Sequence, residues 1–231
     1  MTTGARAADR DTRLSTINKR DLAELYGVRY FAAGTTDIAD ARETNSYFYR
    51  AFMGTHEINV ETGDCVYMIG DDATSARLHR GPTQIHSRSL ATVIRGYMPE
   101  DKTTTIRQGT TLPYVNGCST KQLFPPERPG DPTLQLLYMP PYTTEQAHHI
   151  HSTARVVYVA SGYGTSIVGV GGQTIAQPLS PGMVCILEPM CPHHFETADQ
   201  ALLCIPLHIF SSIGRQELDH PMFNGTHLID R

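Results

Sequence analysis

The sequence lacks the features that mark several classes of protein. No apolar run approaches the roughly 18 residues that a transmembrane helix needs, so no membrane is expected as a partner. No run of basic residues occurs, and 19 Lys and Arg stand against 23 Asp and Glu, a formal net charge of -4. This balance argues against a nucleic-acid-binding face. The first residues are polar and lack the apolar segment of a signal peptide, so we expect a cytoplasmic protein.

Cysteine is scarce, and its spacing is not that of a metal or disulfide framework. There are five cysteines, and no two of them form a Cys-x-x-Cys pair. We interpret them as free, mostly buried thiols in a reducing compartment, which excludes a zinc ribbon. Histidine, in contrast, occurs 11 times, and eight of the 11 lie from residue 148 onward.

The chain is long enough for one sizeable domain with an extension. It has 231 residues, 40% of them hydrophobic, which supplies a real core. Residues 18–26 are predicted to form one short helix, capped by Ser15 or Thr16 and ended by Gly27. Short strands are then expected at 46–53, 65–69, 89–97 and 103–108.

A proline-rich stretch at residues 124–132 separates this part from a sharper β pattern. It cannot occupy a central strand, so we interpret it as a crossing loop or a module boundary. Strands are predicted after it at 133–139, 145–151, 155–160, 164–170, 173–177, 183–187 and 201–210. Many short strands without intervening helices indicate a sandwich or barrel. We therefore expect an extension at 1–125, a barrel at 126–212 and an irregular tail at 213–231.

Two segments of the predicted barrel carry histidines with the spacing of metal ligands. Side chains two residues apart on a strand share a face, so His149 and His151 should point together toward one ion. A third histidine follows Gly182, and either His193 or His194 could supply it. Neighbouring residues of a strand face opposite sides, and the spacing from Gly182 favours His193.

The first of these segments resembles the first motif of the cupins. That motif has a His-x-His pair, a glutamate four residues on, and a glycine seven residues after that. The corresponding positions hold His149, His151, Arg155 and Gly162, while Thr143 stands in place of the motif's initial glycine.

The second segment resembles the second cupin motif, in which a histidine lies eleven residues after a glycine. Gly182, His193 and Phe195 match it, and Thr197 replaces the closing asparagine. The resemblance covers about residues 130–212. It implies an all-β fold: a cupin jelly-roll barrel, here with an N-terminal extension of one short helix and added strands. Cupins commonly pair through added strands, so the resemblance also implies a homodimer.

Arg155 is the main departure from the family, because cupins usually have a metal-ligating glutamate there. A guanidinium stays charged and cannot bind a cation. The resemblance therefore implies one divalent metal per chain on His149, His151 and His193. Strand parity aims Arg155 into the barrel as well, and we predict that it binds the carboxylate or other anion of a small-molecule substrate. A buried structural carboxylate is the alternative partner.

Three functions fit these residues. A three-histidine site leaves coordination positions open, which favours an Fe(II) dioxygenase or oxidase acting on a small organic acid. Zn, Ni, Mn or Cu can occupy imidazole sites too, so a non-redox lyase, decarboxylase or isomerase is the second candidate. That chemistry needs a general base, and no barrel-facing Glu or Asp is evident. The third candidate is a non-catalytic binding or sensing cupin.

Two further assignments stay open in the sequence. Residues 45–120 either form a degenerate second cupin barrel without a metal or, as we prefer, add strands to the first barrel or to an interface. His208 is expected to share a strand face with Cys204, and we interpret it as a core histidine rather than a pocket residue.

Overall fold

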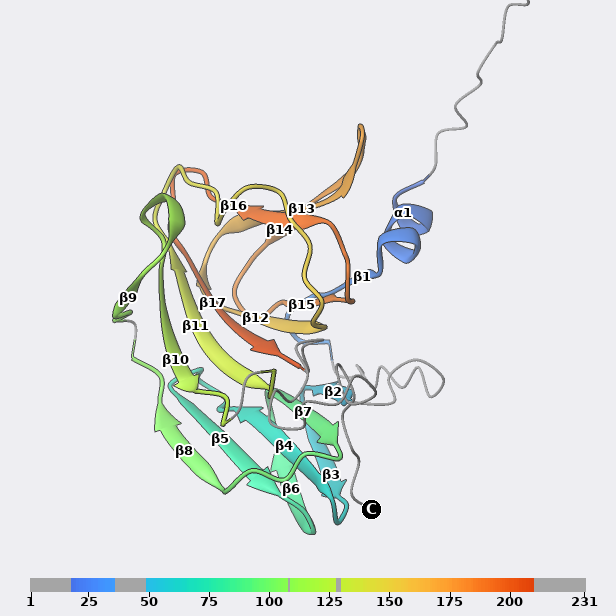
Figure 1. Ribbon diagram of the computed structural model, residues 1–231, viewed down its shortest axis with the longest axis vertical. Coiled ribbons are helices and arrows are strands. Elements are labelled where there is room, and N and C mark those ends of the chain that lie inside the picture. The colour runs from blue at the N-terminus through green and yellow to red at the C-terminus, as the bar shows by residue number, and fades with distance from the viewer. Residues whose placement is uncertain (1–17, 36–48, 108, 128–129, 210–231) are drawn as a thin grey trace, which may run out of the picture.

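A computed structural model describes residues 18–35, 49–107, 109–127 and 130–209. It is mostly β, with one short helix near the N-terminus, and Figure 1 shows a barrel above a second set of sheets. The predicted capping residues Ser15 and Thr16 and the predicted tail at 213–231 lie outside the described residues. No helix in the described ranges has the length and apolar character that crossing a membrane requires.

The helix α1 (Lys19–Tyr26) begins and ends at residues suited to those positions. The side-chain oxygen of Asn18 accepts hydrogen bonds from the backbone N–H groups of Arg20 and Asp21, at 2.9 and 3.0 Å. Gly27 ends the helix in the left-handed conformation, at φ 68°. The predicted helix is therefore confirmed, and Asn18 is the residue that caps it.

The largest sheet has seven strands and carries most of the barrel wall. Its neighbouring strands pair antiparallel wherever a register is assigned. In spatial order the strands are β1 (Val28–Phe31), β15 (Val184–Leu187), β12 (Arg155–Gly162), β17 (Leu202–His208), β11 (Thr133–Met139), β10 (Ser119–Phe124) and β9 (Leu112–Pro113). β1, β9 and β10 come from the part of the chain that the sequence assigned to the extension. A 3-10 turn, η1 (Val115–Gly117), joins β9 to β10.

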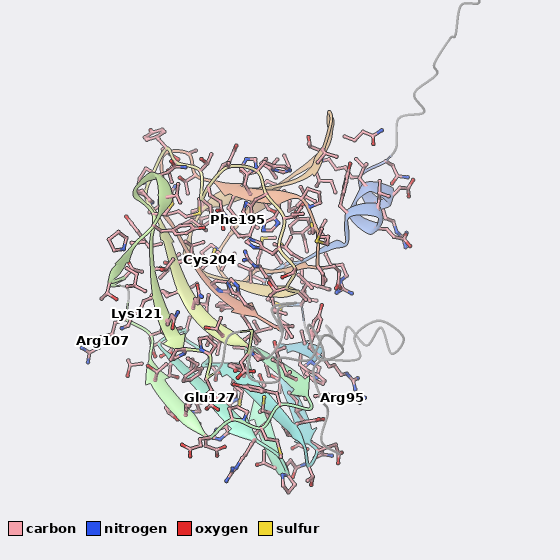
Figure 2. The ribbon with its side chains drawn as sticks, in the orientation of Figure 1. Arg95, Arg107, Lys121, Glu127, Phe195 and Cys204 are labelled. Atoms are coloured by element: carbon pink, nitrogen blue, oxygen red, sulfur yellow. The ribbon has the colours of Figure 1, made fainter. Side chains whose placement is uncertain are left out.

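A three-stranded sheet closes the barrel. Its order is β14 (Gln173–Leu179), β13 (Gly164–Val170) and β16 (His193–Glu196). In Figure 1 this sheet lies across the barrel from β11, β12 and β17. The space between the two sheets holds one hydrophobic core, which includes Phe195 and Cys204 (Figure 2).

The remaining strands form two sheets below the barrel. The five-stranded sheet has the order β2 (Tyr49–Met53), β7 (Leu90–Arg95), β4 (Asp64–Ile69), β5 (Ser75–Arg80) and β8 (Lys102–Thr105). β3 (His56–Val60) pairs with β6 (Thr83–Ser87) in a separate two-stranded sheet. A small core that includes Ile58, Val66 and Val93 lies among these strands.

The seven-stranded sheet is buried on both faces. Val157, Val159 and Cys185 belong to the core inside the barrel, whereas their neighbours Val156 and Ile186 belong to a second core shared with the five-stranded sheet. Successive residues of a strand face opposite sides, so an apolar residue is needed at nearly every position. The barrel is thus supported from below by the sheets of residues 49–105.

One predicted strand does not form. Residues 145–151 form no continuous ladder: they make one isolated bridge to β16, His149 with His193, and a second bridge joins Thr144 to Glu196. Away from the His149–His193 bridge, the backbone N–H of Glu145 donates to the carbonyl of Phe195 at 2.9 Å. The segment therefore runs along the barrel as an irregular connection, where the alternation of a strand does not decide which way side chains point.

Candidate metal centre

Three histidines from two segments meet inside the barrel. His149 and His151 come from the irregular connection before β12, and His193 is the first residue of β16. One ring nitrogen of each lies within 4.8 Å of the others. The ring centroids are 4.4 Å apart for His149 and His151 and 4.6 Å apart for His149 and His193. The structure therefore brings together the three histidines that the sequence predicted.

Backbone carbonyls orient two of these rings. The Nδ1–H of His149 donates to the carbonyl of Ala147, and that of His193 donates to the carbonyl of Cys191, both at 2.8 Å. A carbonyl only accepts, so the proton of a neutral ring lies on Nδ1 and the lone pair on Nε2. A histidine that binds a metal through one ring nitrogen usually donates the N–H of the other ring nitrogen to a carbonyl or carboxylate in this way.

Two of the Nε2 atoms are buried without a hydrogen-bond partner. In the part of the chain that the structure describes, neither His151 Nε2 nor His193 Nε2 has one. Buried polar atoms are nearly always paired, so such atoms call for an explanation. A divalent cation bound between the three rings would accept both lone pairs, and the residues present fit such an ion.

Burial also keeps the three rings uncharged. Desolvation lowers the pKa of His151 and His193 to about 3 and also lowers that of His149, and the nearby charge of Arg155 acts in the same direction. All three rings are therefore neutral at pH 7, the state in which imidazole binds a metal.

Gln146 is a polar neighbour that the sequence did not single out. Its side-chain nitrogen lies 2.6 Å from Nε2 of His149. The oxygen and nitrogen of an amide exchange places on a half-turn, so this side chain can present either atom at the same point. It is therefore a direct neighbour of the nitrogen that His149 would offer to an ion.

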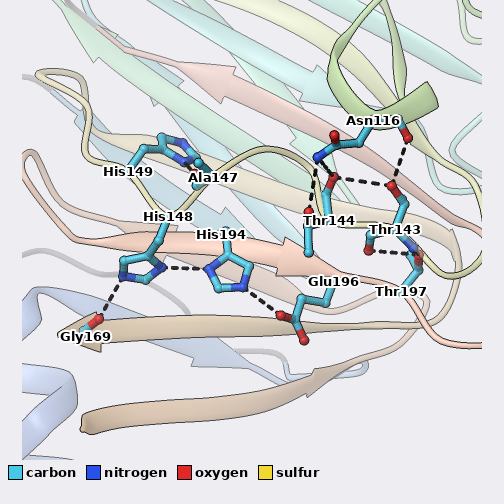
Figure 3. Close-up of polar contacts among 10 residues, drawn as sticks. All are labelled: Asn116, Thr143, Thr144, Ala147, His148, His149, Gly169, His194, Glu196 and Thr197. Atoms are coloured by element: carbon cyan, nitrogen blue, oxygen red, sulfur yellow. Dashed lines mark hydrogen bonds and ion pairs between the residues drawn. The ribbon is translucent and has the colours of Figure 1, made fainter. Parts of the chain in front are cut away.

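His194 and His148 face away from the cluster and join a separate network, shown in Figure 3. Their Nδ1 atoms are 2.6 Å apart, and His148 Nε2 donates to the carbonyl of Gly169 at 2.7 Å. His194 Nε2 donates to Glu196 at 2.8 Å. His193 and His194 thus lie on opposite sides of β16, and the preference for His193 in the cluster is confirmed.

A cavity of about 130 Å³ lies inside the barrel. None of the three clustered histidines lines it, but His151 and His193 act electrostatically on His208, which does. Four titratable side chains reach it: Tyr114, Glu145, Arg155 and His208. The rest of its lining is largely apolar and includes Leu137, Val157, Leu187 and Phe195. Arg155 and Val157 share one face of β12, as strand parity predicts for a side chain directed into the barrel.

Arg155 is a partly buried cation without a full set of partners. Desolvation lowers its pKa to about 10, although Glu145 and Tyr114 act in the opposite direction. It remains charged at pH 7. Its Nε atom is buried and, within the described residues, makes no hydrogen bond. The cavity therefore presents a positive group that has unused hydrogen-bonding capacity.

Two lining residues differ from the sequence interpretation. Glu145 is 5% exposed and lines the cavity, although no barrel-facing carboxylate was expected. His208 lines it too, rather than packing as a core histidine; burial, followed by the charge of Arg155, lowers its pKa well below the usual range. Position 145 lies on the connection that is not a strand, so strand parity could not place it.

Comparisons with known proteins support the fold and leave the chemistry open. No protein-family model matches the sequence, and no curated protein matches it. Among solved structures, a candidate glyoxylate-induced protein from Pseudomonas aeruginosa is 11% identical, with a TM-score of 0.54 over 79% of this chain and 80% of that one. That likeness concerns the fold.

Two further solved structures match smaller parts of the chain. A cupin-like protein from Thermotoga maritima is 19% identical with a TM-score of 0.36, over 40% of this chain and 68% of that one. The DMSP lyase DddQ from Ruegeria pomeroyi is 17% identical with a TM-score of 0.36, over 45% of this chain and 53% of that one. Their similarity is too low to bear on the reaction.

Proposed function

Because the chain has a cupin-like fold with three histidines grouped inside the barrel, we propose that it is a mononuclear metal-dependent enzyme acting on a small anionic organic substrate. The observation that carries this proposal is the pair of buried, unpartnered Nε2 atoms on His151 and His193. Hydrogen bonds from Nδ1 of His149 and His193 to carbonyls leave the lone pair of each neutral ring on Nε2. His149, His151 and His193 would hold the metal.

We favour Fe(II) as the metal and a dioxygenase or oxidase as the activity. Three neutral imidazoles leave the charge of a divalent ion uncompensated and its remaining positions open, and a bound iron would supply redox chemistry at such positions. The protein's own contribution is to keep three rings neutral and oriented in a largely apolar surrounding. Zn, Ni, Mn and Cu also accept imidazole ligands, so metal loading is part of the test.

Arg155 is the residue that we propose binds the substrate. Its guanidinium is charged and lines the cavity, and its Nε atom is buried without a hydrogen-bond partner in the described residues. A carboxylate can receive two parallel hydrogen bonds from a guanidinium, which fixes its orientation as well as its position. Binding the anion there would compensate a charge that the fold otherwise leaves largely unpaired.

Glu145 favours a second candidate function, a non-redox lyase, decarboxylase or isomerase. Such reactions need a group that takes or gives a proton, and a carboxyl in a desolvated site suits this task. Desolvation raises the pKa of Glu145, opposed mainly by Arg155. A metal would act in this case as a Lewis acid.

One experiment separates the candidates. Metal-free protein is reloaded separately with Fe(II), Mn(II), Ni(II) or Zn(II) and incubated with a panel of small carboxylic acids. Oxygen uptake is followed in air, and product formation is followed by NMR with and without oxygen. We expect oxygen consumption by the iron form alone, and its loss in Arg155→Met. Turnover without oxygen would establish the second candidate, and binding without turnover of any acid would contradict an enzymatic role.

A further inference from the structure

An acidic and a basic side chain face the same cavity without pairing. Glu145 Oε2 and Arg155 Nε are both buried, and neither has a hydrogen-bond partner in the described ranges. No ion pair within 4.0 Å joins the two side chains there either. Glu145 is 5% exposed, so water outside the protein does not solvate it.

An arrangement of this kind is costly for a folded protein. Buried ionisable groups are normally paired and hydrogen-bonded, because desolvation of an unpaired one costs several kcal/mol. Glu145 and Arg155 are close enough to interact electrostatically: Arg155 acts to lower the pKa of Glu145, and Glu145 acts to raise that of Arg155. They are nevertheless held apart by their separate backbones, one on the irregular connection and one on β12. The space between them belongs to the cavity.

We propose that the cavity takes a small molecule that carries both a carboxylate and a hydrogen-bond donor, either a hydroxyl or an amino group. The carboxylate would bind Arg155, and the donor would bind Glu145. This inference rests on the proposed function and names the substrate class of the same site. A hydroxy acid and an amino acid share the required chemistry.

The size of the cavity limits the molecule further. Its volume is about 130 Å³, and apolar side chains such as Leu137, Val157 and Phe195 form much of the remaining wall. Polar side chains of Tyr114, Thr120, Gln135 and His208 line the rest of it. The volume therefore limits the ligand to a compact acid of a few non-hydrogen atoms.

The test compares acetate, glycolate and glycine as probes. Their dissociation constants are measured by calorimetry or NMR titration for the wild-type protein, Glu145→Leu, Glu145→Gln and Arg155→Met. Thermal melting of each variant checks that it is folded. In the wild type we expect glycolate or glycine to bind about tenfold more tightly than acetate, as one hydrogen bond to a charged group would give.

The variants separate the two contacts. Glu145→Leu should reduce that preference to less than about twofold, because the donor contact is lost, and it should not weaken acetate binding. Glu145→Gln keeps a neutral acceptor, so it should retain more of the preference for glycolate than of that for glycine. Arg155→Met should weaken all three probes.

The outcomes also separate this inference from the proposed function. A preference that persists in Glu145→Leu, or is missing in the wild type, overturns the assignment of Glu145 and leaves the anion site intact. Acetate binding that is absent, or equal in the wild type and Arg155→Met, overturns the anion site itself and the inference with it.

Discussion

At the scale of single residues, the most unusual feature is a cation that lines a cavity without a full set of hydrogen-bond partners. Arg155 faces this cavity with Nε unpartnered in the described residues, and its pKa is lowered to about 10 mainly by desolvation. Replacing an unpaired, desolvated charge by an apolar side chain of similar volume removes the cost of desolvating it. An apolar substitution at this position should therefore weaken ligand binding without lowering the stability of the fold.

We predict that Arg155→Met leaves the melting temperature unchanged or raises it by up to about 4 °C, which corresponds to about 1 kcal/mol for a chain of this size. Glu145 can take up a proton in the variant, because burial already raises its pKa. Calorimetry without ligand measures the change. A fall of more than about 5 °C would show that Arg155 is structural and would contradict the role given to it.

The residues of the site could be predicted from the sequence only where a regular spacing indicates which way a side chain points. His149, His151 and His193 follow from two motifs of fixed spacing. Arg155 was placed by parity counted from His149 and His151, and although those two residues lie on no strand, Arg155 does line the cavity. Glu145 and Gln146 lie on a connection held by isolated bridges, so no periodicity indicates that they turn inward. His208 was assigned to the right strand face, but whether that face is core or cavity depends on the packing of several strands.

At the scale of elements, the turn between β12 and β13 depends on Gly162. Its φ is 78°, and a Cβ added there would lie 1.9 Å from the carbonyl oxygen of Ala201. Gly172, in the turn between β13 and β14, has a similar φ of 80° but no atom within 4 Å of such a Cβ. The two glycines thus share a backbone conformation and differ in the space around them.

We predict that Gly172→Ala costs about 1–2 kcal/mol, the ordinary penalty of the left-handed conformation. Gly162→Ala should cost at least about 3 kcal/mol, because the backbone of β17 would have to move as well. Denaturant unfolding of both variants gives the two values. Equal losses would show that the approach of Gly162 to Ala201 does not determine this turn.

The elements that the sequence predicted well are those with a local signal. Helix α1 is marked by its polar start and by Gly27, and strands such as β13 and β17 by apolar runs. The strands that were not predicted are β1, β3, β5, β6, β9, β10 and β16. β1 and β16 are short and pair with strands distant in sequence, so little in the local sequence marks them. Residues 145–151 have a strand-like pattern, but the only bridge they make to β16 is the isolated one of His149 with His193.

At the scale of the whole molecule, the seven-stranded sheet joins the barrel to the sheets of residues 49–105. Leu136 lies on its lower face and is fully buried in the core shared with the five-stranded sheet. That core includes Ile94 on β7 and Val156 on β12, which are far apart in sequence. Loss of packing at Leu136 should therefore weaken both parts together.

We predict that Leu136→Ala lowers the free energy of unfolding by about 2–5 kcal/mol, the usual cost of a buried cavity. Hydrogen exchange should accelerate on β7 and β12 alike. The control is Leu112→Ala on β9, where the side chain is 51% exposed and the loss should be below about 0.5 kcal/mol. Faster exchange on one of the two strands alone would contradict a single cooperative unit.

The central claim is that His149, His151 and His193 hold one metal ion, and elemental analysis tests it most directly. The wild type, a His151→Ala/His193→Ala variant and the control His194→Ala are purified without a metal-affinity tag. We predict about one divalent metal per chain in the wild type and the control, and less than about a tenth of that in the double variant. Equal metal in all three proteins, or none in any of them after reloading, would contradict the account.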